Sequence, residues 1–150
     1  MYRWAMNRVY AWFRIVRPPI IFIGMFGAIG GAMVMGVCMD INFWLTMVMW
    51  GILWGGIMVH NDYTDYASDR VNKPWKPLPR GAIKPSTAHI VGSAMMTLPL
   101  PVIFAANLKN GVLNAYSSFF WAFTLWLVGV LYNYWGKDWG VIGHMLVAWG

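Results

Sequence analysis

Residues 41–69 have the sequence INFWLTMVMWGILWGGIMVHNDYTDYASD. The first part, residues 41–60, contains no Asp, Glu, Lys or Arg and is about long enough to cross the hydrocarbon core of a bilayer as a helix. The rest contains three of the five acidic residues of the chain, all five being Asp. A carboxylate at the centre of a membrane helix costs about 2.5–3.5 kcal/mol on insertion scales, so three carboxylates beside a span require a cationic partner.

Composition extends this pattern to the whole chain. Apolar residues make up 59% of the 150 residues, charged residues only 11%, and the mean hydropathy is +0.52. A soluble domain carries about 25% charged residues. Further uncharged stretches occupy residues 20–39, 86–108 with breaks at Pro99 and Pro101, and 112–135, and residues 141–150 start another. The sequence therefore predicts an all-α, polytopic transmembrane helix bundle with four spans and the start of a fifth.

The basic residues predict the orientation of these spans. All Lys and Arg residues except Lys109 lie before the first span, between the second and third, or after the fourth. The positive-inside rule then places the N-terminus and the Asp-rich segment on the cytoplasmic side of the cell membrane. Because the basic residues flank spans and form no separate basic domain, a nucleic-acid partner is not expected. Residues 1–16 fit either an interfacial helix or a basic leader that only sets topology.

The Asp-rich segment has the spacing of one helical stripe. At about 100° per residue, Asn61, Asp65 and Asp69 fall within roughly 80° of a helix circumference, with Asp62 at the edge of that arc. Mg²⁺ prefers oxygen ligands and is often held by one or two carboxylates together with substrate phosphates. The stripe therefore predicts a Mg²⁺ site that holds a diphosphate. The simpler alternative is a solvated polar end of a membrane helix.

The next segment, residues 70–81, has the sequence RVNKPWKPLPRG. Its three prolines and its glycine prevent a continuous helix, so we expect an extended loop that places Lys73, Lys76 and Arg80 near the Asp stripe. Lys and Arg are natural partners of phosphate oxygens. Charge alone leaves this interpretation open, because cytoplasmic loops of membrane proteins are basic in any case.

Together these segments resemble the UbiA superfamily of intramembrane prenyltransferases. The family pattern N-D-x-x-D-x-x-x-D corresponds to residues 61–69, and N-x-P-x-[KR]-P-[LI]-P-x-G corresponds to residues 72–81. Arg17 followed by two prolines is similar to the family's entry to the first span, and Tyr132 with Lys137 is similar to its Tyr-x-x-x-x-Lys motif.

The resemblance implies transfer of an isoprenyl group from its diphosphate to a lipid, large-ring or aromatic acceptor, with Mg²⁺ bridging the diphosphate to the Asp residues. The expected partners are the isoprenyl diphosphate, the acceptor and the lipid bilayer. The resemblance ranks Lys73 and Arg80 above Lys76 as phosphate contacts. The roles that it assigns are metal binding by Asn61, Asp62, Asp65 and Asp69, catalysis by Asp65, Asp69, Tyr132 and Lys137, and diphosphate binding by Arg17, Lys73, Arg80 and Lys137.

The chain departs from the family pattern in its length. Members of the superfamily have about nine spans of about 20 residues each and a second Asp-rich motif. No Asp-x-x-x-Asp follows Asp69 in this sequence. We therefore expect residues 1–150 to be the N-terminal part of one transmembrane prenyltransferase domain, inactive on its own. A non-catalytic membrane protein that binds a divalent cation or a polyprenyl phosphate is the alternative.

Overall fold

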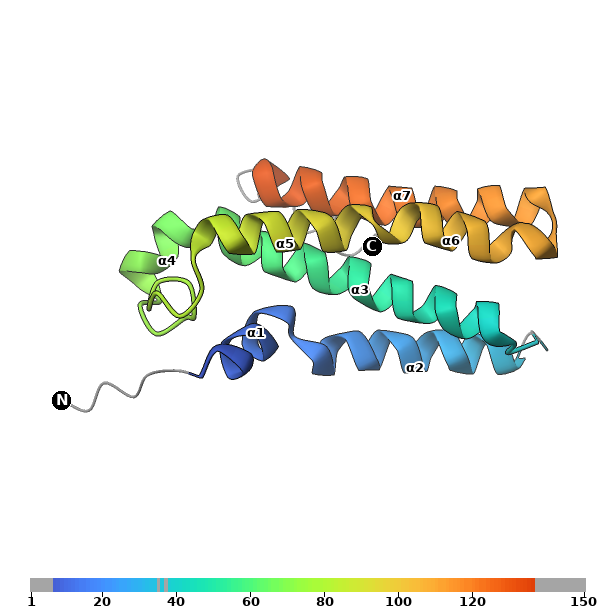
Figure 1. The fold of residues 1–150 in the computed structure, drawn as a ribbon, viewed down its shortest axis with the longest axis horizontal. Coiled ribbons are helices and arrows are strands. Elements are labelled where there is room, and N and C mark those ends of the chain that lie inside the picture. Colours follow the sequence, from blue (N-terminus) through green and yellow to red (C-terminus); the bar gives the residue numbers. More distant parts are fainter. Residues whose placement is uncertain (1–6, 35, 37, 137–150) are drawn as a thin grey trace.

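The computed structural model describes residues 7–34, 36 and 38–136, and this part of the chain is helical without any strand (Figure 1). The all-α prediction is therefore confirmed for the described residues. The elements are α1 (Arg8–Val16), α2 (Pro18–Val34), α3 (Ile41–Thr64), α4 (Tyr66–Asn72), α5 (Pro85–Thr97), α6 (Pro99–Asn107), the 3₁₀ turn η1 (Leu108–Asn110) and α7 (Val112–Tyr134).

The predicted spans correspond to helices of the structure. Three helical segments, α3, Pro85–Asn110 and α7, are long and apolar enough to cross a membrane. A fourth span arises if α1 and α2, which meet at a bend of 43°, are taken together. The stretch 141–150, which we expected to start a fifth span, lies outside the described residues.

The third predicted span continues past Pro99 and Pro101, where one helix ends and the next begins. Pro99 occupies the first turn of α6, where a backbone N–H would have no partner within the helix. The preceding residue, Leu98, still donates its N–H to the carbonyl of Ala94 at 2.9 Å. The prolines therefore divide the span into α5 and α6 without ending it.

Helix α3 packs closely against α5 because each helix presents a glycine to the other. A Cβ atom added at Gly56 would lie 2.8 Å from both the Cβ of Met95 and the backbone N of Met96. A Cβ at Gly92 would lie 3.1 Å from the backbone N of His60. Small residues at helix interfaces allow the close packing that holds membrane helices together. This contact fixes α3, and with it the Asp-rich segment, relative to α5.

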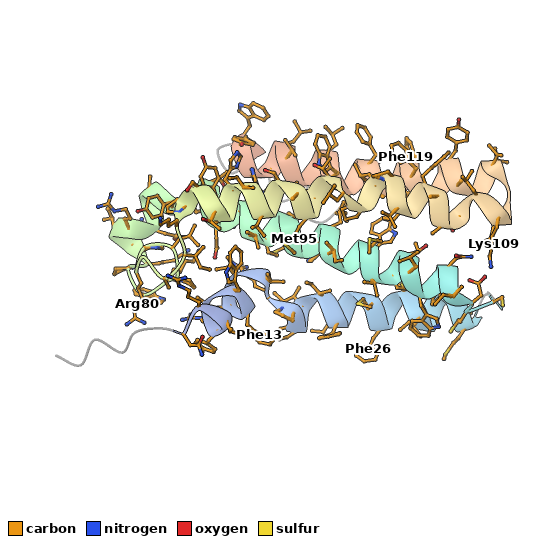
Figure 2. All side chains as sticks on the ribbon, viewed as in Figure 1. Phe13, Phe26, Arg80, Met95, Lys109 and Phe119 are labelled. Carbon is orange, nitrogen blue, oxygen red and sulfur yellow. The ribbon has the colours of Figure 1, made fainter. Side chains whose placement is uncertain are left out.

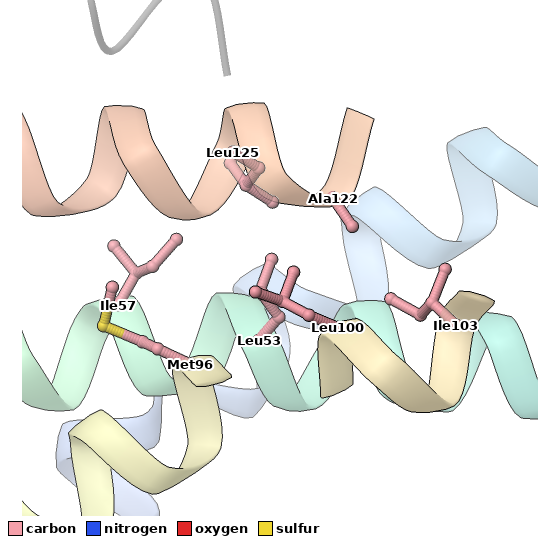
Figure 3. Packing of buried hydrophobic residues seen from close by; sticks show 7 residues of the cluster. All are labelled: Leu53, Ile57, Met96, Leu100, Ile103, Ala122 and Leu125. Atoms are coloured by element: carbon pink, nitrogen blue, oxygen red, sulfur yellow. The ribbon is translucent and has the colours of Figure 1, made fainter. Parts of the chain in front are cut away.

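Two apolar clusters fill the bundle. The first joins α3, α5, α6 and α7 through Leu53, Ile57, Met96, Leu100, Ile103, Ala122 and Leu125 (Figure 3). The second lies at the end of the bundle that carries the Asp-rich segment, and it joins α1, α3, α5 and the loop before α5 through Ala11, Ile15, Val59, Leu78, Ile83 and Ala88. The second cluster anchors the proline-rich loop against the helices.

The N-terminal segment forms the short helix α1 and turns sharply into α2. The side chain of Asn7 accepts a hydrogen bond from the backbone N–H of Val9 at 3.0 Å and caps the helix. Arg17 ends it in the left-handed conformation, with φ of 56°, and donates its N–H to the carbonyl of Phe13 at 3.2 Å. Ala11 and Ile15 are buried, whereas Phe13 is exposed on the outer side (Figure 2).

Helix α2 is the most loosely packed of the long helices. Ala32 is its only buried residue, and a Cβ added at Gly24, Gly27 or Gly30 would meet no neighbouring atom within 4 Å in the described structure. Cys38, the single cysteine of the chain, is exposed between α2 and α3. It lies at the opposite end of α3 from the Asp-rich segment.

Candidate active site

The Asp-rich segment spans the junction of α3 and α4. Helical hydrogen bonds continue across this junction, since Asp65 N–H bonds to the Asn61 carbonyl at 3.0 Å and Asp69 N–H bonds to the Asp65 carbonyl at 2.8 Å. Asn61, Asp65 and Asp69 therefore keep the one-turn spacing predicted from the sequence. Asp62 and Asp69 are almost completely buried.

Two of the carboxylates converge on one ammonium group. Lys76 Nζ lies 3.0 Å from Oδ1 of Asp62 and 2.6 Å from Oδ2 of Asp69. The exposed fractions of the three side chains are only 16% for Lys76, 5% for Asp62 and 3% for Asp69. Hydrogen bonds between charged groups are short and strong, particularly away from water. This group of three side chains, Asp62, Asp69 and Lys76, is called the carboxylate–lysine triad below.

Each carboxylate of the triad also contacts a second cation. Arg17 Nη2 lies 3.3 Å from Oδ1 of Asp62, and Lys73 Nζ lies 3.7 Å from Oδ1 of Asp69. These two cations are more exposed than Lys76, at 37% for Arg17 and 52% for Lys73. The left-handed turn at Arg17 brings its guanidinium to a carboxylate 45 residues further along the chain.

The remaining two residues of the predicted stripe bond to each other. Asn61 Nδ2 donates to Oδ2 of Asp65 at 3.3 Å. Both side chains are partly exposed. The four oxygen-bearing residues are thus arranged as two adjacent pairs, Asn61 with Asp65 and Asp62 with Asp69.

The loop after α4 is not extended, so the prediction of an extended proline-rich loop was wrong. Backbone hydrogen bonds fold it into consecutive turns, from Lys76 N–H to the Lys73 carbonyl at 3.0 Å and from Arg80 N–H to the Lys76 carbonyl at 3.1 Å. Prolines remove only their own donors, which leaves the other N–H groups free to close turns. Gly81, with φ of 75°, and the buried Leu78 complete the compact shape.

The turns decide which basic residues reach the carboxylates. They place Lys76 inside the triad and Lys73 beside it. Arg80 is exposed at the end of the molecule and forms no ion pair with any described residue (Figure 2). Lys76, which the family resemblance ranked below Lys73 and Arg80, therefore makes the closest contacts with the carboxylates of the Asp-rich segment. Its position between two prolines in the loop motif was the one signal that could have singled it out.

Lys76 is held in its charged form. Burial lowers the pKa of its ammonium group, but hydrogen bonds to Asp69 and Asp62 outweigh that effect and raise the pKa above the usual 10.5. At neutral pH the triad thus holds a full positive charge between Asp62 and Asp69.

Of the two remaining predicted site residues, the structure describes only Tyr132. Tyr132 is half-buried on α7. Lys137 lies outside the described residues, so the expected pairing of the two has no structural description. The neighbouring Asn133 is buried and donates to the carbonyl of Ile57 at 3.3 Å.

An aromatic and imidazole cluster lies beside the Asp-rich segment. His60 of α3 packs against His89 of α5 and Tyr134 of α7, with ring centroids 5.5 Å and 5.4 Å apart. Tyr63 stacks on His89 at 4.6 Å. These rings connect the three helices at the level where the carboxylates begin.

The oxygen donors fit Mg²⁺ by their chemistry. Within the described part of the chain, no three His, Cys, Asp or Glu side chains are arranged to hold a metal ion together. Asp62 and Asp69 nevertheless converge on a common cation, the ammonium of Lys76. Carboxylate and amide oxygens are the ligands that Mg²⁺ accepts. The donor set therefore suits a hard divalent cation, although the triad as it stands is closed by Lys76.

Comparison with known proteins places the whole of this region in one family. A sequence model of the UbiA prenyltransferase family matches residues 19–150. The digeranylgeranylglyceryl phosphate synthase of Thermococcus sibiricus is 29% identical over 138 residues, which cover 89% of this chain and 46% of that protein. The synthase of the same name from Pyrococcus furiosus is 27% identical, with coverage of 93% and 48%.

A relative with a different acceptor in its name also matches. The protoheme IX farnesyltransferase of Bartonella tribocorum is 30% identical over 82% of this chain and 39% of its own length. The chain thus spans less than half the length of these relatives. No solved structure matches the chain significantly.

Proposed function

The chain belongs to the UbiA prenyltransferase family, and on that premise we propose that it forms one wall of the active site of an intramembrane prenyltransferase. The reaction would transfer an isoprenyl group from its diphosphate to an acceptor. The observation that carries this proposal is the convergence of buried Asp62 and Asp69 on one cation at the end of an apolar span. Buried carboxylates of this kind are costly to maintain and mark functional sites in membrane proteins.

The residues that would hold Mg²⁺ are Asn61, Asp65 and Asp69, with Asp62 in support. The chemistry that a bound Mg²⁺ supplies is neutralisation of the diphosphate charge that develops as the isoprenyl group departs. Positive charges placed in advance at the leaving group are usually a large part of catalysis. Arg17 and Lys73 supply such charges from this chain, next to the carboxylates. Arg80 and Lys137 are further candidates for diphosphate binding.

Apolar helices around the site would protect the reaction from water. Departure of diphosphate from an isoprenyl group leaves an allylic cation, which water would otherwise capture in place of the acceptor. The chain is a membrane protein whose α3, α5, α6 and α7 pack around an apolar core. We propose that the site opens toward the cytoplasm, because the basic residues gather at that end.

The acceptor that we propose is a lipid, because the relatives named digeranylgeranylglyceryl phosphate synthase match over most of this chain. A large-ring acceptor is the second candidate, since a protoheme IX farnesyltransferase also matches. Aromatic acceptors are third. The non-catalytic alternative is a membrane protein that binds a divalent cation or a polyprenyl phosphate. It is supported by the triad, whose carboxylates already hold a cation, the ammonium of Lys76.

The test uses the protein expressed from its complete reading frame and reconstituted in nanodiscs. Labelled geranylgeranyl diphosphate is supplied with Mg²⁺ and, in separate reactions, a glycerophosphate lipid, protoheme or an aromatic acid. Prenylated lipid is the expected product. If no acceptor gives Mg²⁺-dependent transfer or diphosphate release, the protein is not a prenyltransferase and the binding alternative stands.

Matched variants assign the residues. Asp65→Ala and Asp69→Ala should each lower turnover by about 100-fold or more, since each removes a ligand of the Mg²⁺ that would neutralise the departing diphosphate. Asp40→Ala, at the opposite end of α3, should leave turnover close to that of the unmodified protein. Full activity in both Asp65→Ala and Asp69→Ala would show that these carboxylates do not hold the metal.

A further inference from the structure

We propose that Lys76 is a tethered competitor for the divalent cation: its ammonium fills the position between Asp62 and Asp69, and a divalent cation binds these carboxylates only when the Lys76 side chain swings out. This inference rests on the proposed function, because it takes the carboxylates to be metal ligands. It adds a step that the family assignment does not contain, an exchange of one cation for another within the site.

Distances make the two cations mutually exclusive. Lys76 Nζ is 3.0 Å from Asp62 and 2.6 Å from Asp69, so it occupies the space between the two carboxylates. Mg²⁺ requires its oxygen ligands at about 2.0–2.1 Å. An ion that reached both carboxylates at such a distance would lie where the ammonium now lies.

Charge leads to the same conclusion. The two carboxylates of the triad are already contacted by three cations, Arg17, Lys73 and Lys76. A divalent cation added to this set would face an excess of positive charge in a site of low exposure, where repulsion is poorly screened. One of the three must therefore move away. Arg17 and Lys73 each contact only one of the two carboxylates, so only Lys76 blocks the position between them.

The surroundings of Lys76 determine how it moves. Its neighbours Pro77 and Leu78 are buried, and Leu78 belongs to the apolar cluster with Ile15 and Val59. Opening the loop would expose Leu78 to water. The four-carbon stem of lysine is flexible, so rotation of the side chain alone can remove the ammonium. The exchange is therefore a swing of one side chain, and the backbone turns stay closed.

The first experiment measures Mn²⁺ binding to the full protein without any prenyl substrate, by electron paramagnetic resonance. Removing the competitor in Lys76→Gln should tighten Mn²⁺ binding by about tenfold or more, because a site closed most of the time binds more weakly in proportion to its open fraction. Lys84→Gln, an exposed lysine at the start of α5, is the matched control and should bind as the unmodified protein does. Lys76→Arg should restore weak binding. Equal or weaker Mn²⁺ binding in Lys76→Gln overturns the proposal.

The second experiment needs no variant, so it holds even if Lys76→Gln does not fold. The rate at which an amine-reactive reagent modifies Lys76 is followed by mass spectrometry with and without saturating Mn²⁺. Mn²⁺ should speed modification of Lys76 several-fold and leave Lys84 unchanged, while the amides of Arg80 and Gly81, which close the turns, keep their protection from hydrogen exchange. An unchanged Lys76 rate overturns the competition, and loss of amide protection overturns the side-chain swing.

The tests of cation exchange and the test of prenyl transfer can give independent results. Both experiments report on cation exchange without turnover. Prenyl transfer by the unmodified protein together with unaltered Mn²⁺ binding in Lys76→Gln would refute the competition alone. Tighter Mn²⁺ binding in Lys76→Gln without any prenyl transfer would refute the enzymatic function and leave the competition in place.

Discussion

The two ends of α3 carry the same chemistry, aspartate paired with lysine, in opposite circumstances. At the first end Asp40 pairs with Lys109, and the side chains are 29% and 53% exposed. At the other end Asp62 and Asp69 pair with Lys76, and none of the three side chains is more than 16% exposed. Figure 2 shows the two ends, marked by Lys109 and by Arg80 of the proline-rich loop.

The difference lies in what else the carboxylate does. Asp40 caps α3 by accepting hydrogen bonds from the backbone N–H groups of Asn42 and Phe43 at 3.1 and 2.9 Å. Asp62 and Asp69 accept only from basic side chains among the described hydrogen bonds. A capping aspartate stabilises its own helix. Buried ion pairs seldom stabilise a fold in proportion to their cost, so stability alone does not account for the triad.

The two lysines that pair with these carboxylates, Lys76 and Lys109, are also anchored differently. The variant with the largest predicted effect tests this difference. Leu78, two residues after Lys76, is 1% exposed, whereas Lys109 lies in η1, which has no buried residue. Leu78→Ala should cost about 3 kcal/mol of unfolding free energy, through lost packing and the cavity left behind. Steric trapping in bicelles measures this quantity. Leu108→Ala, next to Lys109, is the control and should cost less than about 0.5 kcal/mol. Equal costs would mean that the proline-rich loop is no better anchored than η1.

A smaller effect is expected when the carboxylate itself is neutralised at the buried end. Asp62→Asn removes the charge that Arg17 and Lys76 share, while Lys76 keeps Asp69. Loss of hydrogen bonds between charged groups should then cost about 2 kcal/mol. Asp40→Asn should shift the unfolding midpoint much less, because asparagine is an equally good helix cap. A larger shift for Asp40→Asn than for Asp62→Asn in the same assay would reverse the comparison.

The smallest effect concerns acid pH at the exposed end. The hydrogen bonds from Lys109 and from the Phe43 backbone lower the pKa of Asp40 below the usual 3.8. A carboxyl group with a lowered pKa in the folded state stabilises the fold above its unfolded pKa, and this contribution is lost as the pH falls below about 3.8 through the folded value. The unfolding midpoint of the unmodified protein should therefore fall toward that of Asp40→Ala between pH 5 and pH 3. A constant difference between the two proteins over this range would contradict the assigned pKa shift.

Much of the fold could be predicted because lipid imposes simple rules on sequence. Stretches without charge have to be helices of spanning length, and α3 and α7 begin within one residue of where the uncharged stretches begin. The one-turn spacing of Asn61, Asp65 and Asp69 likewise follows from helix geometry alone. These features depend on neighbours along the chain.

The arrangement of the site could not be predicted because it depends on contacts between distant segments. Three prolines forbid a helix between residues 73 and 80 but do not say which turns form instead. The inward position of Lys76 results from the burial of Leu78 among residues of α1, α3 and α5. The pairing of Arg17 with Asp62 requires a left-handed backbone at a residue other than glycine, for which the local sequence gives no signal.

The exposed thiol of Cys38 gives the molecule a natural reporter. Since residues 1–150 contain one cysteine, a thiol-reactive dye attaches at a single known position in this part of the protein, two residues before Asp40. That position and the carboxylate–lysine triad lie at opposite ends of the same long helix. A dye that cannot pass through the bilayer therefore reports, from the side on which it reacts, which compartment the triad faces, without any engineered substitution.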